Sequence, residues 1–208
     1  MSFLKSVLFG SEGSYNIFGI QANFEKEVPS WYPSSSLEGA GFISKTAIKC
    51  INSNMFRWIT QGYAHVFAHE MSHALTFKLL SGQDTTIEVF KSSCTGGSRH
   101  PLATLPDWKK TIVKVAGPMG DIAFSTCKLV AATSLKSYLS WPVALALGSG
   151  AVIWMSGELL YAYTSALNRD PGDFGCIASY GKTYLALAST ALVSQVALGI
   201  FAAVKLAA

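Results

Sequence analysis

Two long segments with almost no charge constrain the fold more than any other feature of this sequence. Residues 141–167 contain one charged side chain, and residues 183–204 contain none. An α-helix needs about 20 apolar residues to cross a bilayer, and both segments reach that length. Residues 58–80 and 110–133 are apolar over a similar length but include ionisable side chains. The sequence therefore predicts an all-α integral membrane protein, built as a bundle of about four transmembrane helices.

The composition agrees with a membrane location. Hydrophobic residues make up 50% of the 208 residues and charged residues only 13%, whereas soluble domains carry about 25% charged residues. We expect a multi-pass protein of the cell membrane, in contact with the lipid bilayer. The basic residues are scattered, so a nucleic-acid partner is not indicated. The sequence does not indicate an oligomeric state.

The chain divides into an N-terminal mixed or interfacial region, residues 1–57, and a transmembrane region, residues 58–208. Apolar residues at helical spacing over 3–8 predict a small interfacial helix, and alternation over 18–24 predicts a short strand. Between the first two long helices, "TTIEVFKSS" has the β-branched content of a strand and "CTGGSRH" the residues of a turn. We expect a small β-hairpin insert there.

The distribution of basic residues predicts an orientation. Six basic residues lie between the end of the first long helix and the start of the second. The end of the second helix and the loop into the third carry only Lys128 and Lys136. Those six are Lys78, Lys91, Arg99, Lys109, Lys110 and Lys114. Cytoplasmic loops are enriched in Lys and Arg, so this loop and the 168–182 loop are expected to face the cytoplasm.

Histidines in "AHEMSH" (residues 68–73) have the spacing of a zinc site. His69 and His73 are four residues apart, which places both imidazoles on one face of a helix. Zinc suits imidazole and takes three protein ligands in a catalytic site, and Glu70 is placed to accept a proton from the water that fills the fourth position. The stretch therefore predicts one zinc ion per chain, bound by His69 and His73, with Glu70 as general base.

Several other ionisable side chains fall within or beside the apolar segments. Such groups are costly in a bilayer and normally face a bundle interior or a water-filled cavity, which is expected for His65, Asp121 and Glu158. His65 lies one turn before His69, about 6 Å along the helix axis, so we interpret it as a neighbour of the site rather than a ligand. His100 precedes Pro101 in a loop and is expected to be exposed.

The third metal ligand is not fixed by the spacing. The turn "NRDPGDFG" (residues 168–175) offers Asp170 and Asp173 after the third long helix, and either carboxylate is compatible with the role. Glu158, about 14 Å deep in that helix by its rise per residue, is a rival. An aspartate in such a turn also commonly caps a helix, so the turn alone does not decide.

The order of these motifs resembles the site-2 protease family of intramembrane zinc metalloproteases. The resemblance covers residues 59–180 and rests on "HEMSH", on "AGPMGD" (residues 116–121) and on an aspartate-bearing Pro and Gly turn after a further apolar helix. It implies a bundle of transmembrane helices that holds zinc below the membrane surface. The sequence departs from the family pattern in two places. Asp121 stands where Asn is usual, and "DPGDFG" replaces an Asn-Pro-Asp-Gly type turn.

The resemblance also implies roles for single residues. His69 and His73 match the zinc histidines and Glu70 the catalytic glutamate. Asp173 is the favoured third ligand, because "GDFG" leads straight into the next helix as the family's aspartate does, and because Asp170 is restricted by the proline that follows it. Asn168 corresponds to the turn asparagine that the family is proposed to use against the substrate carbonyl.

The sequence thus predicts an enzyme, a zinc metalloendopeptidase that hydrolyses peptide bonds of membrane-embedded protein substrates. Residues 58–208 would then form a transmembrane metalloprotease domain. A helical substrate must unwind before cleavage, and the "TTIEVF" strand is expected to pair with its extended segment. Two alternatives come from other classes, namely a catalytically inactive relative that binds or holds a membrane partner, and a small transporter with a polar path.

Overall fold

The computed structural model describes residues 3–29, 62–92, 95–135 and 137–207, together with the isolated positions 42 and 46. This part of the chain is mostly helical and contains one small four-stranded sheet. Its helices are α1 (Phe3–Phe9), α4 (Gly62–Ser81), α5 (Asp107–Ser134), α6 (Trp141–Asn168), α7 (Asp173–Tyr180) and α8 (Lys182–Ala207), with a 3-10 turn at Leu102–Thr104. The four long helices lie where the hydropathy pattern predicts them.

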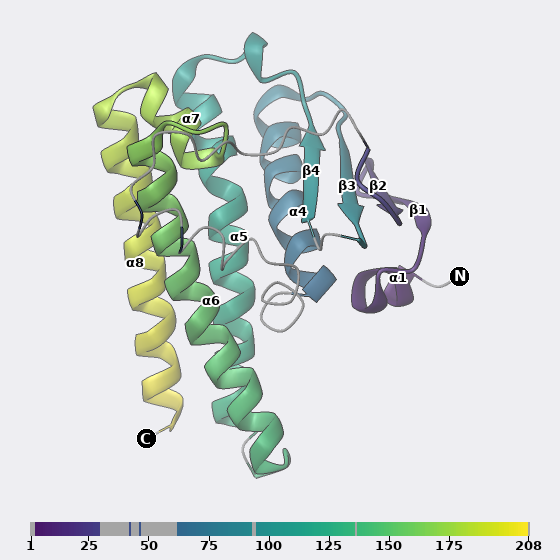
Figure 1. The fold of residues 1–208 in the computed structure, drawn as a ribbon, viewed down its shortest axis with the longest axis vertical. Coiled ribbons are helices and arrows are strands. Elements are labelled where there is room, and N and C mark those ends of the chain that lie inside the picture. The colour runs from purple at the N-terminus through teal and green to yellow at the C-terminus, as the bar shows by residue number, and fades with distance from the viewer. Residues whose placement is uncertain are drawn as a thin grey trace.

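The elements are arranged in successive layers. Figure 1 shows the sheet on one side of α4, with α5 on the other side of α4 and with α6 and α8 beyond α5. Helix α5 is central, because it packs against α4, α6, α7 and α8. The short helix α7 lies at the end of the bundle where α6 ends and α8 begins. Residues from α4, α5 and α7 therefore meet at this end of α5.

The sheet combines two hairpins. Strand β1 (Gly13–Ile17) pairs antiparallel with β2 (Ile20–Glu25), and β3 (Thr86–Phe90) pairs antiparallel with β4 (Thr95–Arg99). The hairpins join through a parallel pairing of β2 with β3. The first hairpin turns at Phe18 and Gly19, which both have positive φ, as tight hairpin turns require. The strand predicted over residues 18–24 thus begins after the turn, and the helix predicted over residues 3–8 is confirmed as α1.

The predicted hairpin insert is present, but it is half of this larger sheet. "CTGGSRH" is not only a turn, since residues 95–99 form β4. β3 is also not an edge strand, because β2 and β4 occupy both of its sides. The expectation that "TTIEVF" pairs with a substrate is therefore wrong. The sequence signal failed here because parallel pairing between strands some 65 residues apart leaves no local trace.

The face of α4 that touches the sheet is a hydrophobic core. Alternate residues of β2 are buried, and they pack with β3 against one side of α4. Members of this cluster include Ile20, Ala22, Phe24, Val66, Ala74, Ile87 and Val89. Because this side of α4 is occupied by the sheet, His69 and His73 lie on the side that faces α5.

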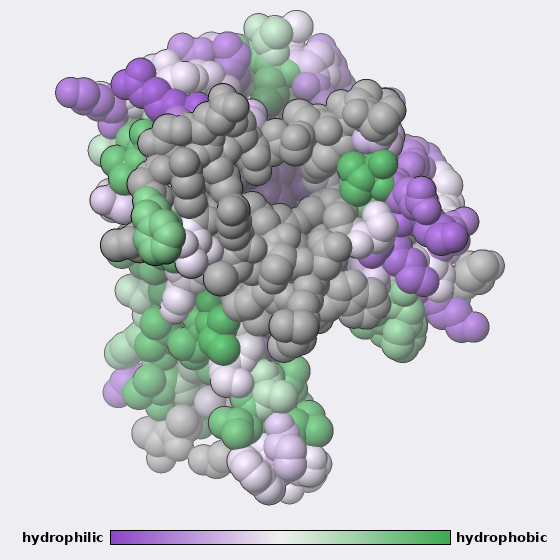
Figure 2. Space-filling view, viewed as in Figure 1, coloured by the Kyte–Doolittle hydropathy of each residue, from purple (hydrophilic) through white to green (hydrophobic). Residues whose placement is uncertain are grey.

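Two of the four predicted spans are helices long and apolar enough to cross a membrane, namely α6 and α8. Figure 2 shows hydrophobic side chains gathered over these helices in the lower part of the view, with hydrophilic ones at the upper end and over the sheet side. Within the described residues, α4 and α5 do not reach that hydropathy, so four transmembrane helices are not confirmed. Apolar residues of α4 pack against the sheet, and α4 also packs against α5.

Candidate metal centre

His69 and His73 point their Nε2 atoms at the same place. The two Nε2 atoms are 3.1 Å apart. Each ring is held from behind by its Nδ1 atom: that of His69 lies 2.7 Å from Asp121 Oδ2, and that of His73 lies 2.6 Å from the carbonyl oxygen of Val113. Such contacts fix ring orientation and tautomer, as outer partners of metal-bound histidines commonly do.

The hydrogen bonding explains why this arrangement suits a cation. A backbone carbonyl only accepts, so the Nδ1 of His73 must donate, and the ionised carboxylate of Asp121 likewise requires a donor on His69. A neutral imidazole that donates from Nδ1 carries a lone pair on Nε2. Two such lone pairs face each other across 3.1 Å, and a metal ion between them would be their natural partner.

Asp173 supplies the third donor. It is the first residue of α7, and its Oδ2 atom lies 3.4 Å from the Nε2 atoms of both histidines. Lys114 contacts the other carboxylate oxygen at 3.2 Å, and the Tyr161 hydroxyl accepts the Asp173 backbone N–H at 3.1 Å. These ligand atoms of His69, His73 and Asp173 lie within 4.8 Å of one another, so the group can bind a metal ion.

The carboxylate of Asp170 makes different contacts. Its Oδ1 atom accepts hydrogen bonds from Ser165 Oγ at 2.6 Å and from the Gly172 N–H at 2.9 Å. Both contacts fold residues 165–172 into the tight turn that starts α7. Of the two aspartates that the sequence left open, Asp173 is therefore the one brought to the histidines, while Asp170 shapes the turn that carries it.

Asp121 and His65 form the layer behind His69. The buried carboxylate of Asp121 contacts His65 Nδ1 at 3.3 Å as well as His69. The His65 ring packs against Phe124 and Trp154, with centroids 4.7 and 5.4 Å away. His65 therefore reaches the site through Asp121, as a neighbour rather than a member of the ligand group. Glu158 is also buried and is likewise outside that group.

Glu70 lies beside the ligand group, against β4. Its side chain is buried. Gly96 makes the space for it, because a Cβ at position 96 would stand 2.8 Å from Glu70 Cγ. Gly96 thus allows β4 to pass close to the glutamate that the sequence predicts as general base.

Asn168 is the last residue of α6 and does not belong to the ligand group. Its Nδ2 atom is buried and has no hydrogen-bond partner among the described residues. The structure thus gives this amide a free donor, and its predicted role against a substrate carbonyl stays a prediction.

His100 is not exposed, contrary to the expectation from its loop position. Its ring stacks on Phe77 at 5.0 Å between centroids and lies 6.2 Å from the ring of His73. Burial lowers the pKa of His100 to about 4, with the neighbouring His73 and Lys114 acting in the same direction. The residue is therefore neutral at pH 7, and it closes one side of the histidine pair.

Several residues around the centre carried no clear signal in the sequence. Lys114 and Tyr161 act only through Asp173, 59 and 12 residues away, so their roles depend on how α5 and α6 pack. The one usable signal is the small residue in "AGPMGD". A Cβ at Gly117 would overlap the Nε2 atoms of His69 and His73, so glycine is what lets α5 pass in front of them.

Replacing Gly117 by alanine is expected to weaken metal binding by roughly 5-fold to 100-fold, because overpacking a well-filled site typically costs about 1–3 kcal/mol. Gly157 is the matched control, since it is a helical glycine with no atom within 4 Å of an added Cβ. Gly157→Ala should keep full metal affinity and gain about 0.5–1 kcal/mol of stability. Titration of both variants with zinc against a competing chelator makes the comparison, and equal affinities would contradict the assignment of the site.

Comparisons with known proteins find no relative. No family model matches the sequence, no curated protein matches it, and no solved structure matches its fold.

Proposed function

We propose that this protein is a membrane-embedded zinc metalloprotease of the site-2 protease type, which hydrolyses peptide bonds of membrane-embedded protein substrates. The observation that carries the proposal is the convergence of two imidazoles and a carboxylate on one point, with the carboxylate of Glu70 beside it. Three protein donors that leave a position for water are typical of catalytic rather than structural zinc.

Zinc fits the donor set of His69, His73 and Asp173, which offers two imidazole nitrogens and one carboxylate oxygen. When bound, zinc would polarise a substrate carbonyl and acidify water at the site. The chain supplies the remaining elements of the site. Asp121 and the Val113 carbonyl hold the imidazoles in the tautomer that leaves Nε2 free, and Lys114 with Tyr161 holds the carboxylate in place.

Glu70 is the proposed general base and acid. Its carboxylate would accept a proton from the attacking water and deliver it to the leaving amine of the peptide bond. Burial between α4 and β4 keeps this side chain from bulk water and fixes its position next to the histidines. The Nδ2 donor of Asn168, which has no partner in the part of the chain that the structure describes, would stabilise the oxyanion that forms on the substrate carbonyl.

The substrate class follows from the membrane character of α6 and α8. A substrate helix hides its carbonyls in its own hydrogen bonds, so the segment to be cleaved must become extended. Strand β4 lies at one edge of the described sheet, and it packs against α4. We infer that an extended substrate pairs with β4, which would bring its backbone past Glu70.

The proposal is tested with the full chain reconstituted with zinc in liposomes, together with a library of single-span transmembrane peptides that differ in helix stability. Mass spectrometry then detects new peptide termini. We expect cleavage of the library members whose helices unwind most easily, and loss of that cleavage when a chelator removes the metal. Absence of new termini from every member, in protein that holds stoichiometric zinc, would contradict the proposal.

A polar path for ions or protons is the second candidate, and one observation favours it. His65 Nε2 and Glu158 Oε2 are buried and have no hydrogen-bond partner among the described residues, and the other ring nitrogen of His65 contacts Asp121. Partnerless polar atoms of this kind inside a bundle suit a water-filled path. The two functions are separable, because ion flux through reconstituted protein would persist without Glu70, whereas proteolysis would not.

A further inference from the structure

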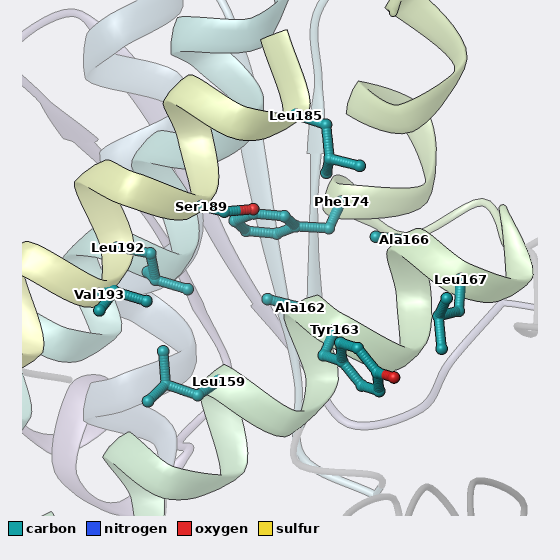
Figure 3. Close-up of a pocket in the computed structure, with 10 residues that line it drawn as sticks. All are labelled: Leu159, Ala162, Tyr163, Ala166, Leu167, Phe174, Leu185, Ser189, Leu192 and Val193. Carbon is teal, nitrogen blue, oxygen red and sulfur yellow. The ribbon is translucent and has the colours of Figure 1, made fainter. Parts of the chain in front are cut away.

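A second feature of the molecule is an apolar groove between α6, α7 and α8. It has a volume of about 410 Å³, and Figure 3 shows its lining, with Phe174 of α7 reaching between the two long helices. Phe174 and Leu192 form a buried floor. Tyr163, Leu167 and Val193 stand at the rim with more than half of each side chain exposed. The groove is therefore open to whatever surrounds α6 and α8.

Two cations stand at one end of this groove. Arg169 follows Leu167 of the lining by two residues, and Lys182 precedes Leu185 by three residues, about 4.5 Å of helical rise. Both side chains are exposed, and neither forms an ion pair within the part of the chain that the structure describes. The carboxylate of the neighbouring Asp170 is buried and directed at Ser165 Oγ and the Gly172 N–H rather than at either cation.

The combination of an apolar groove with cations at one end suits an amphiphile with an anionic head. Both helices are candidate membrane spans, and the positive-inside rule predicts that the 168–182 loop, and with it this end, faces the cytoplasmic leaflet, where anionic lipids are concentrated. Basic pockets between membrane helices on that side commonly bind anionic head groups.

The shape of the groove also favours a lipid chain over a peptide helix. Its lining extends over more than two turns of each of α6 and α8. A thin acyl chain can follow that length. Ser189 is the one hydroxyl among the lining residues apart from Tyr163, which leaves few polar groups for a peptide backbone.

We propose that this groove binds an anionic phospholipid, with one acyl chain along α6 and α8 on top of Phe174 and the phosphate between Arg169 and Lys182. This site lies outside the metal centre, and lipid binding there requires neither metal nor peptide hydrolysis. Its failure is therefore distinguishable from failure of the proposed function.

The test uses the full chain in detergent micelles, titrated with dioleoyl phosphatidylglycerol or dioleoyl phosphatidylcholine, with bound lipid counted by native mass spectrometry. Ala166→Trp fills the groove, and Ala146→Trp places the same side chain on an exposed position of α6 outside it. Arg169→Gln with Lys182→Gln removes the cations, and Lys205→Gln removes one at the other end of α8. Circular dichroism and size-exclusion chromatography check that each variant is folded.

We expect the unmodified chain to retain one phosphatidylglycerol in preference to phosphatidylcholine. Ala166→Trp should abolish that retention, and loss of the cations should weaken it about fivefold for each one removed. Both controls should bind as the unmodified chain does. Equal binding of the two lipids, or unchanged phosphatidylglycerol binding in a folded Ala166→Trp variant, would overturn the proposal. If a single-span peptide displaces the lipid and then stays bound, the groove is a peptide site, and this result would also overturn the lipid proposal.

Discussion

Glu70→Gln is expected to lower peptide hydrolysis by about 100-fold to 10,000-fold while the protein keeps one metal ion per chain. A positioned general base and acid contributes rate enhancement of that order, and an amide cannot take up the proton. Glutamine has the shape of glutamate, so it fits the space that Gly96 leaves between α4 and β4. His69, His73 and Asp173 are unchanged, so metal binding has no reason to fall.

The measurement pairs the liposome cleavage assay with metal analysis on the same preparation. Glu25→Gln is the matched control, because Glu25 is an exposed residue at the end of β2. This variant should cleave the peptides at the rate of the unmodified protein. Full cleavage by the Glu70→Gln variant would exclude Glu70 as the base. Loss of metal together with activity would instead assign Glu70 to the ligand group.

Asp173→Ala is expected to reduce bound metal from one per chain to below roughly a tenth. Outer partners of a metal ligand already change affinity by about 10-fold to 100-fold, so removal of a ligand atom should exceed that. The substitution also leaves the Lys114 ammonium without its contact to the Asp173 carboxylate, which adds a second cost. Dialysis against zinc followed by elemental analysis measures the loss.

Asp170→Ala is the paired control, since it removes a carboxylate from the same turn. Here the buried Ser165 Oγ and the Gly172 N–H lose their acceptor, which typically costs about 1–3 kcal/mol of stability. We expect a lower melting temperature with zinc still bound. Zinc retention in Asp173→Ala together with zinc loss in a folded Asp170→Ala protein would reverse the assignment of the two aspartates.

The separation of these aspartates illustrates a limit of sequence reasoning. Both lie in one Pro and Gly turn three residues apart, and both have the side chain that a metal or a helix cap requires. Their contacts separate them. Ser165 donates a hydrogen bond to the Asp170 carboxylate, whereas the Tyr161 hydroxyl accepts the backbone N–H of Asp173 and holds that residue toward the histidines. Both contacts come from the preceding helix, whose rotation about its axis the sequence does not specify.

Asp121 illustrates the same limit from the other direction. In the sequence it is a departure from the pattern that the motif order resembles, and its role was left open. In the structure its carboxylate accepts a hydrogen bond from Nδ1 of His69, which lies 52 residues earlier in the chain. A carboxylate can hold the imidazole tautomer by accepting from Nδ1, and this is a tertiary contact between α4 and α5.

The number of membrane spans could be predicted only in part for a related reason. Hydropathy marks α6 and α8 as candidate spans, because their apolar residues extend around the whole helix. It does not decide α4, because the same apolar residues that suit lipid also suit packing between a sheet and a neighbouring helix. The N-terminal hairpin supplies that sheet through β2, and no local signal at residues 62–81 reveals its presence.

The sequence by itself determined the local features: the histidine pair with Glu70 on one helix, the limits of the long helices, and the alternating strand β2. Each depends on residues within a few positions of one another, where backbone periodicity fixes which side chains share a face. Only the tertiary structure decided the third ligand, the partners of the imidazoles, the joined sheet and the groove over Phe174. Those features depend on packing between distant segments, and such packing is set by the whole core rather than by any stretch of it.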